Sequence, residues 1–189
     1  MSKPYIRIHL RILHQPRIDL AGIIEATRDI YSAIGIEVEV ASIQRLDIPD
    51  LLDVYIADCA MGDPTAAQRR LFENRDSCGP RDIFIYFIRS TVPSSTGCAS
   101  HPSDKAGLII TEIANRWTLA HEIGHVLGLA HVVDQGRLMS SSRTDCETSA
   151  LPAATSIEQF IIGGSRFIHT EGSANGSVGE VAHSRGVRP

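Results

Sequence analysis

Three histidines and a glutamate stand together between His121 and His131, where the sequence has the form HExxHxxGxxH. Residues four apart lie on the same face of a helix, so His121 and His125 can direct two imidazoles at one point. Neutral imidazole is a good zinc ligand, and a catalytic zinc site usually takes three protein ligands and one water. The spacing therefore predicts a zinc site with His121, His125 and His131 as its ligands.

His131 follows His125 by six residues, too far round a continuous helix to join the first two histidines. The chain must therefore leave the helix and turn back, and Gly128 lies where that break is needed. Glycine adopts the left-handed conformation that ends helices at little steric cost. The alternative is an amphipathic surface helix with incidental histidines, because HExxH alone is a short motif.

Glu122 directly follows the first histidine of the motif. From there its carboxylate can lean over a zinc-bound water and act as general base on a water that the metal has already acidified. The surrounding residues must then form a buried helix, which we predict from Arg116 to Leu127 with Asn115 as its N-cap. This segment has the wide apolar surface that is typical of a helix packed against a sheet.

Met139 lies eight residues beyond His131. With this methionine, the motif resembles that of the metzincin clan of zinc endopeptidases. The sequence HEIGHVLGLAH and the eight-residue gap are similar to those of matrixins, the matrix metalloproteinases. The resemblance implies that Met139 is the Met-turn residue, a hydrophobic floor beneath the three imidazoles. The chain departs from the matrixin pattern at Val132, where matrixins usually have Ser or Thr, and has no tyrosine beyond Tyr86, so the family within the clan stays open.

The resemblance implies an α+β fold with a twisted, mixed five-stranded sheet, a backing helix, the active-site helix and a small lower subdomain after the Met-turn. A single metallopeptidase catalytic domain would cover residues 1–169, with its upper subdomain at about 1–128 and its lower one at about 129–169. A cleft between them would hold Zn²⁺ at its floor. Residues 140–143 would form one wall, and residues 96–101 would form a rim strand to which an extended substrate could add.

The resemblance also implies a zinc metalloendopeptidase, a hydrolase in which a metal-activated water attacks a peptide carbonyl and Glu122 passes a proton to the leaving amine. The alternative is a catalytically silent, zinc-stabilised protein-binding module with a metzincin-like fold. Glu122 favours the enzyme, because a structural zinc site needs no such carboxylate and usually closes its fourth position. We expect a monomer that acts on a protein or peptide substrate, with a protein inhibitor as one means of limiting an activity for which no prodomain is visible.

Apolar patterns along the chain predict the remaining elements. Alternation or continuous apolar runs predict strands at residues 5–13, 36–40, 53–57, 83–88 and 107–111. Helical spacing and capping residues predict helices at about 20–34, 63–75 and 156–162. In the first strand, Arg7, His9 and Arg11 are expected to face solvent, and the Gly- and Ser-rich composition from Thr170 onward predicts a disordered tail.

The composition is ordinary for a single globular domain with a sizeable core, at 189 residues and 43% hydrophobic content. A net charge of −4 gives no reason to expect nucleic acid or an anionic membrane as a partner. No apolar run approaches the roughly 20 residues that span a bilayer, and no signal peptide is visible, so cytoplasmic location and signal-less or processed export stay open. His101, His169 and His183 are expected at the surface, because none has a partner at ligand spacing.

The chain has four cysteines, Cys59, Cys78, Cys98 and Cys146, which allow three complete sets of disulfide pairs. Disulfides would fit an exported enzyme, and free thiols would fit a cytosolic one. We expect disulfides, with Cys59–Cys78 as the most local pair. The resemblance to matrixins also suggests the hypothesis that a thiolate, such as that of Cys146, reaches the zinc and silences it.

Overall fold

A mixed β-sheet forms the centre of the protein, whose computed structural model describes residues 3–59, 63–76, 78–141 and 150–170. Five strands lie in the order β2-β1-β4-β7-β6, and a sixth strand, β8, pairs with β1. Neighbouring strands among β2, β1, β4 and β7 are parallel, whereas β6 and β8 are antiparallel to their partners. The strands are β1 (Tyr5–Ile12), β2 (Glu37–Arg45), β4 (Ile83–Ile88), β6 (Gly97–Cys98), β7 (Gly107–Thr111) and β8 (Ile168–His169).

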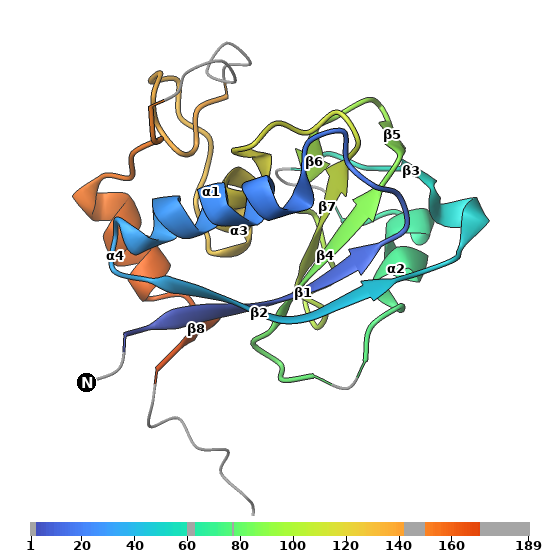
Figure 1. Cartoon of the computed structure of the whole chain (residues 1–189), viewed down its shortest axis with the longest axis horizontal. Helices are drawn as coiled ribbons and strands as arrows, with labels where there is room; N and C mark the ends of the chain where they lie inside the picture. Colours follow the sequence, from blue (N-terminus) through green and yellow to red (C-terminus); the bar gives the residue numbers. More distant parts are fainter. Residues whose placement is uncertain (1–2, 60–62, 77, 142–149, 171–189) are drawn as a thin grey trace, which may run out of the picture.

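Two helices, α1 (Leu20–Ser32) and α3 (Thr118–Val126), cover one face of this sheet (Figure 1). Alternate residues of β1 point into the core that they form with the sheet, so the period-two pattern is explained by burial on this side. The phenol of Tyr31 on α1 donates a hydrogen bond of 3.0 Å to the Ala120 carbonyl of α3. The backing helix and the motif-bearing helix are therefore joined by a polar contact as well as by packing.

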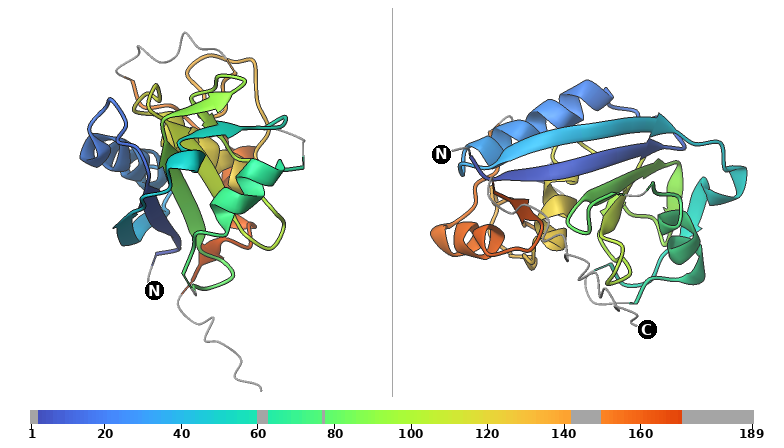
Figure 2. Two further views of the ribbon diagram at one scale, coloured as in Figure 1. Left: turned by 90° about the vertical axis from the view of Figure 1, so that its right-hand side faces the viewer. Right: turned by 90° about the horizontal axis from the view of Figure 1, so that it is seen from below.

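The opposite face of the sheet is covered as well, by α2 (Ala66–Phe72) and the chain that follows it (Figure 2). The prediction that His9 and Arg11 face solvent was wrong, because they are only 8% and 1% exposed. Arg11 lies over the Phe84 ring and donates a hydrogen bond of 2.8 Å to Asp76, which precedes β4. Burial of this guanidinium is tolerated because aromatic and carboxylate partners replace water.

The predicted strand at 53–57 lies outside the main sheet. Its residues form β3 (Asp53–Tyr55), which pairs in parallel with β5 (Ser90–Val92) in a separate two-stranded sheet. Asp53 accepts hydrogen bonds from Arg89 and Ser90, which tie the two strands together. The fifth strand of the main sheet is instead β6, within the predicted rim segment 96–101, and the α+β class with a mixed sheet is confirmed.

The disulfide joins Cys59 to Cys98, so the prediction of a Cys59–Cys78 pair was wrong. Cys98 lies on β6, and the fold brings its Cα to 5.1 Å from that of Cys59 across a sequence separation of 39 residues. Sequence proximity favoured the Cys59–Cys78 pair, but the position of Cys98 depends on the pairing of β6 with β7, which short-range sequence patterns do not reveal. Cys78 is a free thiol and half-buried, whereas Cys146 lies outside the described residues.

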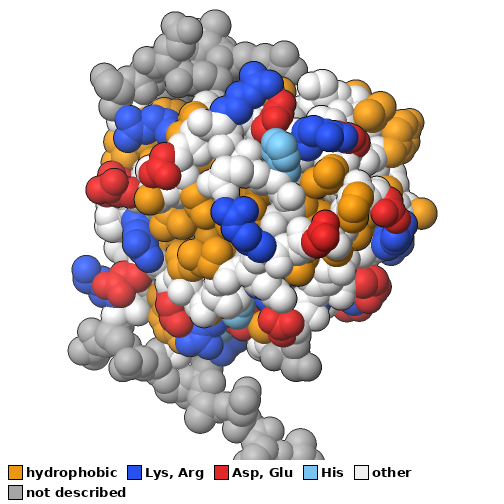
Figure 3. All heavy atoms as spheres, turned by 45° about the vertical axis from the view of Figure 1, so that its right-hand side comes forward, with side chains coloured by type: hydrophobic (Ala, Val, Ile, Leu, Met, Phe, Trp, Pro, Cys, Tyr) orange, Lys and Arg blue, Asp and Glu red, His pale blue; other side chains and the backbone are white. Residues whose placement is uncertain are grey.

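The C-terminal part of the described chain contains α4 (Ser156–Gly163), which begins with the predicted capping box. The Thr155 hydroxyl oxygen accepts a hydrogen bond from the Glu158 backbone N–H, and the Glu158 carboxylate accepts one from the Thr155 backbone N–H. The predicted tail lies outside the described residues beyond Thr170. None of the described helices is both long and apolar enough to cross a bilayer. Basic and acidic side chains are interspersed on the face seen in Figure 3.

The contact between Tyr31 and α3 leads to a prediction about stability. Tyr31→Phe removes the donor to the Ala120 carbonyl and should lower the free energy of unfolding by about 1 kcal/mol. Urea denaturation of both proteins measures the difference. Tyr55→Phe is the matched control, because Tyr55 is 64% exposed and should tolerate the change. An equal loss in both variants would contradict the assigned role of the Tyr31 hydroxyl.

Candidate metal centre

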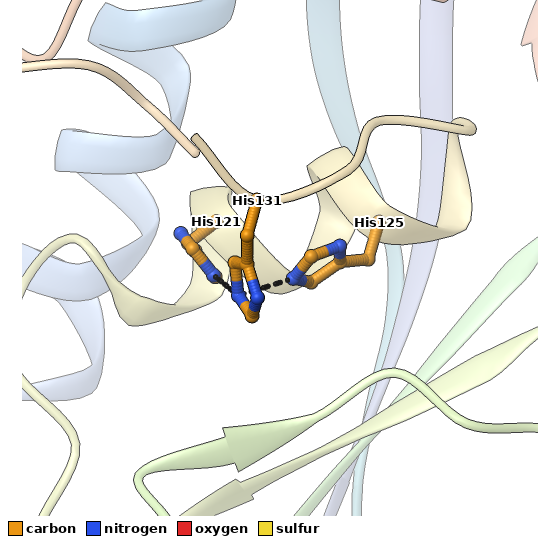
Figure 4. Close-up of side chains that lie close together, drawn as sticks. All are labelled: His121, His125 and His131. Carbon is orange, nitrogen blue, oxygen red and sulfur yellow. Dashed lines mark hydrogen bonds between the residues drawn. The ribbon is translucent and has the colours of Figure 1, made fainter. Parts of the chain in front are cut away.

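The three histidines of the motif converge, with His121 and His125 on α3 and His131 on the segment after it (Figure 4). The Nε2 atom of His131 lies 3.1 Å from that of His121 and 3.0 Å from that of His125. Two ligands of a tetrahedral zinc ion, each at about 2.0–2.1 Å from it, are themselves about 3.3–3.4 Å apart. The observed spacing is therefore close to what one small divalent cation requires.

Backbone carbonyls orient two of the rings. The Nδ1 atom of His121 lies 2.8 Å from the Leu138 carbonyl, and that of His125 lies 2.9 Å from the Leu129 carbonyl. A carbonyl can only accept, so each Nδ1 carries the proton and each Nε2 of a neutral ring presents a lone pair. Metal-bound histidines commonly donate their other ring N–H in this way. His121 and His125 thus present electron pairs, rather than protons, toward His131.

The turn after α3 brings His131 back to the first two histidines. Gly128 has a φ of +105°, the left-handed conformation predicted for it. The Gly128 N–H donates to His125 O at 3.0 Å and the Leu129 N–H donates to Gly124 O at 2.9 Å, which together form a Schellman motif. These two bonds satisfy the carbonyls of Gly124 and His125 at the end of the helix, and His131 follows three residues after Gly128.

Met139 lies in the loop that runs below the helix and is fully buried. Backbone hydrogen bonds hold this loop to the segment after the helix, since Val132 N donates to Met139 O at 2.9 Å and Ser141 N donates to Val132 O at 3.0 Å. A Cβ at Gly124 would lie only 2.5 Å from the Met139 sulfur. The methionine therefore contacts α3 itself, between the turns that carry His121 and His125.

Glu122 projects into a cavity that all three histidines also line. Its side chain is only 6% exposed, and a Cβ at Gly97 of β6 would lie 2.7 Å from its Cγ and Oε1 atoms. The cavity has a volume of about 260 Å³, and Ser140 and Ser141 from the predicted wall line it, whereas residues 142–143 lie outside the described chain. A carboxylate, three imidazoles and an edge strand therefore share one space.

Burial shifts the protonation of these groups. It raises the pKa of Glu122 to about 8. Burial also lowers the pKa of His125 to about 4, although the Leu129 carbonyl opposes the shift, and it lowers the pKa of His121 in the same way. The imidazoles of His121 and His125 are therefore neutral near pH 7, as metal ligands must be. A divalent cation beside Glu122 would favour its ionised form.

Sequence reasoning missed several residues of this site. Trp117 lines the cavity and is 7% exposed, and its indole N–H has no hydrogen-bond partner in the described part of the chain. The prediction of Asn115 as the N-cap was wrong, because α3 begins at Thr118 and its N-cap is Trp117, which makes no side-chain capping bond. Asn115 instead accepts from the backbone N–H groups of Trp117 and Thr118 in the turn before the helix. Arg137 holds the methionine loop to α4 through a hydrogen bond of 2.6 Å to Glu158.

No protein-family model matches the chain, and no curated protein does either. Solved structures do share its fold. Metalloproteinase-II from Bacteroides fragilis matches with a TM-score of 0.60 at 17% identity over 84% of this chain, which spans about half of that protein (52%). Archaemetzincin from Methanopyrus kandleri matches with a TM-score of 0.56 at 16% identity, over 84% of this chain and 94% of its own. At these identities the likeness establishes a metzincin-like fold, and it gives no support to the matrixins over other families.

The close approach of α3 to Met139 predicts the effect of added volume. Gly124→Ala should lower the free energy of unfolding by about 1–3 kcal/mol, because the new methyl group overlaps the buried methionine sulfur. Chemical denaturation measures the loss. Gly163→Ala in α4 is the matched control, since nothing lies within 4 Å of a Cβ there. If both variants were as stable as the parent, the packing described for Met139 would be incorrect.

Proposed function

We propose that this protein is a zinc-dependent endopeptidase whose metal is held by His121, His125 and His131. The observation that carries the proposal is the convergence of three imidazole nitrogens beside a buried carboxylate in an open cavity. Three protein ligands with a free fourth side are typical of catalytic zinc, whereas structural zinc is enclosed by four. The fold neighbours include a protein named as a metalloproteinase, which supports the same class of activity.

The residues present fit zinc better than harder cations. All three donors are imidazole nitrogens, and magnesium and calcium prefer oxygen ligands. When bound, zinc acts as a Lewis acid that makes water more acidic and polarises a peptide carbonyl. The Nδ1–H groups of His121 and His125 donate to the carbonyls of Leu138 and Leu129. These bonds keep the ring proton on Nδ1 and hold the Nε2 atoms, the proposed ligands, in place.

Glu122 is the residue that we propose moves the proton. Its carboxylate lies at the cavity that the histidines line. It is not one of the possible metal ligands, which are the three histidines. There it would accept a proton from the attacking water at an Oε atom and return it to the amine that leaves. The burial that excludes bulk water from Glu122 also strengthens its electrostatic interaction with a cation.

Substrate binding at the edge of the sheet is the second part of the proposal. The strand β6 ends the main sheet, and its residue Gly97 lines the cavity together with Glu122. An extended peptide could add to this edge by main-chain hydrogen bonds, which tolerate many sequences. Ser140 and Ser141 would then flank the side chain that follows the cleaved bond. Met139 would support the site from beneath, as a packed residue and not as a ligand.

The competing proposal is a catalytically silent, zinc-stabilised protein-binding module. It shares the histidine cluster, but it gives no reason for a carboxylate buried beside an open cavity. A buried, desolvated carboxyl group destabilises a fold unless it is compensated or used. The two proposals differ in one measurable property, because only the enzyme cleaves peptide bonds and loses that activity with a zinc chelator.

Replacement of the proposed base separates catalysis from metal binding. Glu122→Gln should keep the metal content of the parent and lower the rate of peptide-library cleavage about 10²–10⁴-fold. Elemental analysis and a fluorogenic peptide assay measure the two properties. Glu25→Gln, an exposed change on α1, is the matched control and should keep full activity. Cleavage by Glu122→Gln at the rate of the parent would exclude the proposed role.

The contact between β6 and Glu122 predicts a remote effect on the same reaction. Gly97→Ala places a methyl group 2.7 Å from the Glu122 carboxylate, so the carboxylate must move. We expect kcat to fall at least about tenfold with unchanged zinc content, because small displacements of a catalytic group are costly. Gly22→Ala is the control, since a Cβ there meets nothing within 4 Å. Undiminished kcat in Gly97→Ala would show that Glu122 does not act from this position.

A further inference from the structure

A second cluster of metal-binding side chains lies on the face of the sheet opposite α1 and α3. His9 on β1, Asp82 just before β4, and the free thiol of Cys78 place one possible ligand atom each within 4.8 Å of the others. His169 on β8 lies against the same carboxylate, because β8 pairs with β1 (Figure 1). Four residues from three separate parts of the chain therefore meet at one place.

The cluster is buried. His9, Asp82 and His169 are 8%, 3% and 7% exposed, and Cys78 is half-buried. The rings are fixed by stacking, His9 on Phe84 with centroids 4.7 Å apart and His169 on Tyr5 with centroids 4.9 Å apart. Side chains that are held in this way are pre-organised and cannot turn toward solvent to satisfy their polar atoms.

Protein hydrogen bonds satisfy the cluster only in part. The Asp82 Oδ2 atom accepts from the Gly79 backbone N–H at 3.0 Å and lies 3.3 Å from His9 Nε2. The other oxygen, Oδ1, lies 3.3 Å from His169 Nε2, yet neither atom has a hydrogen-bond partner among the described residues. A buried polar atom without a partner destabilises a fold, so a group that satisfies these atoms would stabilise it.

The separation of His9 from Asp82 and the donor types of the three residues fit a small transition-metal cation. Nitrogen and oxygen ligands of one tetrahedral zinc ion are about 3.3 Å apart, which matches the separation of His9 Nε2 from Asp82 Oδ2. The other nitrogen of His9 lies 2.8 Å from the Ser42 hydroxyl, the kind of outer contact that metal-bound histidines keep. A thiol beside an imidazole and a carboxylate favours zinc over calcium or magnesium.

We propose that His9, Cys78 and Asp82 bind a second zinc ion, and that His169 supports the Asp82 carboxylate from β8. The ion would join the first strand, the segment before β4 and the last described strand, so its role is structural. The site lies on the other face of the sheet from His121, His125 and His131 and does not depend on peptidase activity. It replaces the expectation that His9 and His169 are surface residues.

Cobalt substitution distinguishes the two sites, because among the described residues only the second cluster contains a thiol. The full chain, purified without reductant, is freed of metal and titrated with Co²⁺. We expect a thiolate-to-cobalt charge-transfer absorption in the near ultraviolet. It should persist in a His121→Ala/His125→Ala variant and be lost in Cys78→Ser. Cys146→Ser, the matched cysteine control, should keep it.

Metal stoichiometry gives an independent readout that does not require the cysteine variant to fold. Native mass spectrometry of the zinc-loaded parent should show two ions per chain, and the His121→Ala/His125→Ala variant should show one. Asp82→Asn should also show one, while peptide cleavage persists if the proposed function is correct. A charge-transfer absorption that disappears in Cys146→Ser, or its absence from the parent together with a single zinc per chain, would overturn the second site.

Discussion

The geometry of the candidate centre depends on the chain reversing immediately after α3. His121 and His125 are placed by helical spacing alone, but the third imidazole can reach them only if the helix stops within one turn. The Schellman hydrogen bonds and the left-handed Gly128 supply that stop and satisfy the carbonyls of Gly124 and His125. The reversed segment then pairs with the methionine loop, whose Leu138 carbonyl returns to orient His121. The turn after α3 thus determines both the position of the His131 ring and, through the Leu138 carbonyl, the tautomer of His121.

Close packing around the centre follows from two glycines that leave room for other side chains. Gly124 lets the Met139 sulfur reach α3, and Gly97 lets the Glu122 carboxylate lie against β6. In both cases any larger residue would push a functional group away from the histidines, since interiors are packed almost without voids. The disulfide between Cys59 and Cys98 holds β6 at the same place. The positions of Met139 and Glu122 therefore depend on the lack of a side chain at Gly124 and Gly97.

The sequence predicted what is local in this structure. The convergence of the histidines, the helix break at Gly128 and the capping box at Thr155 each depend on residues that are close along the chain, and each is present. The partner of Cys59 and the burial of His9 were predicted incorrectly, because both depend on segments that meet only in the fold. Period-two alternation in β1 shows that one face is apolar, but it cannot show that α2 and the chain that follows it cover the polar face too. A polar face with aromatic neighbours can be buried when its charges find partners.

Electrostatics couples metal binding to catalysis in the proposed enzyme. Burial that raises the pKa of Glu122 to about 8 leaves most of this group protonated at pH 7, and a protonated carboxyl cannot accept a proton from water. A divalent cation a few ångströms away favours the carboxylate, and its effect is strong because the site excludes bulk water. The same residue would thus be an inactive acid without the metal and an active base with it. Loss of zinc would then remove both the Lewis acid and the base, which is why a carboxylate that binds no metal can still depend on one.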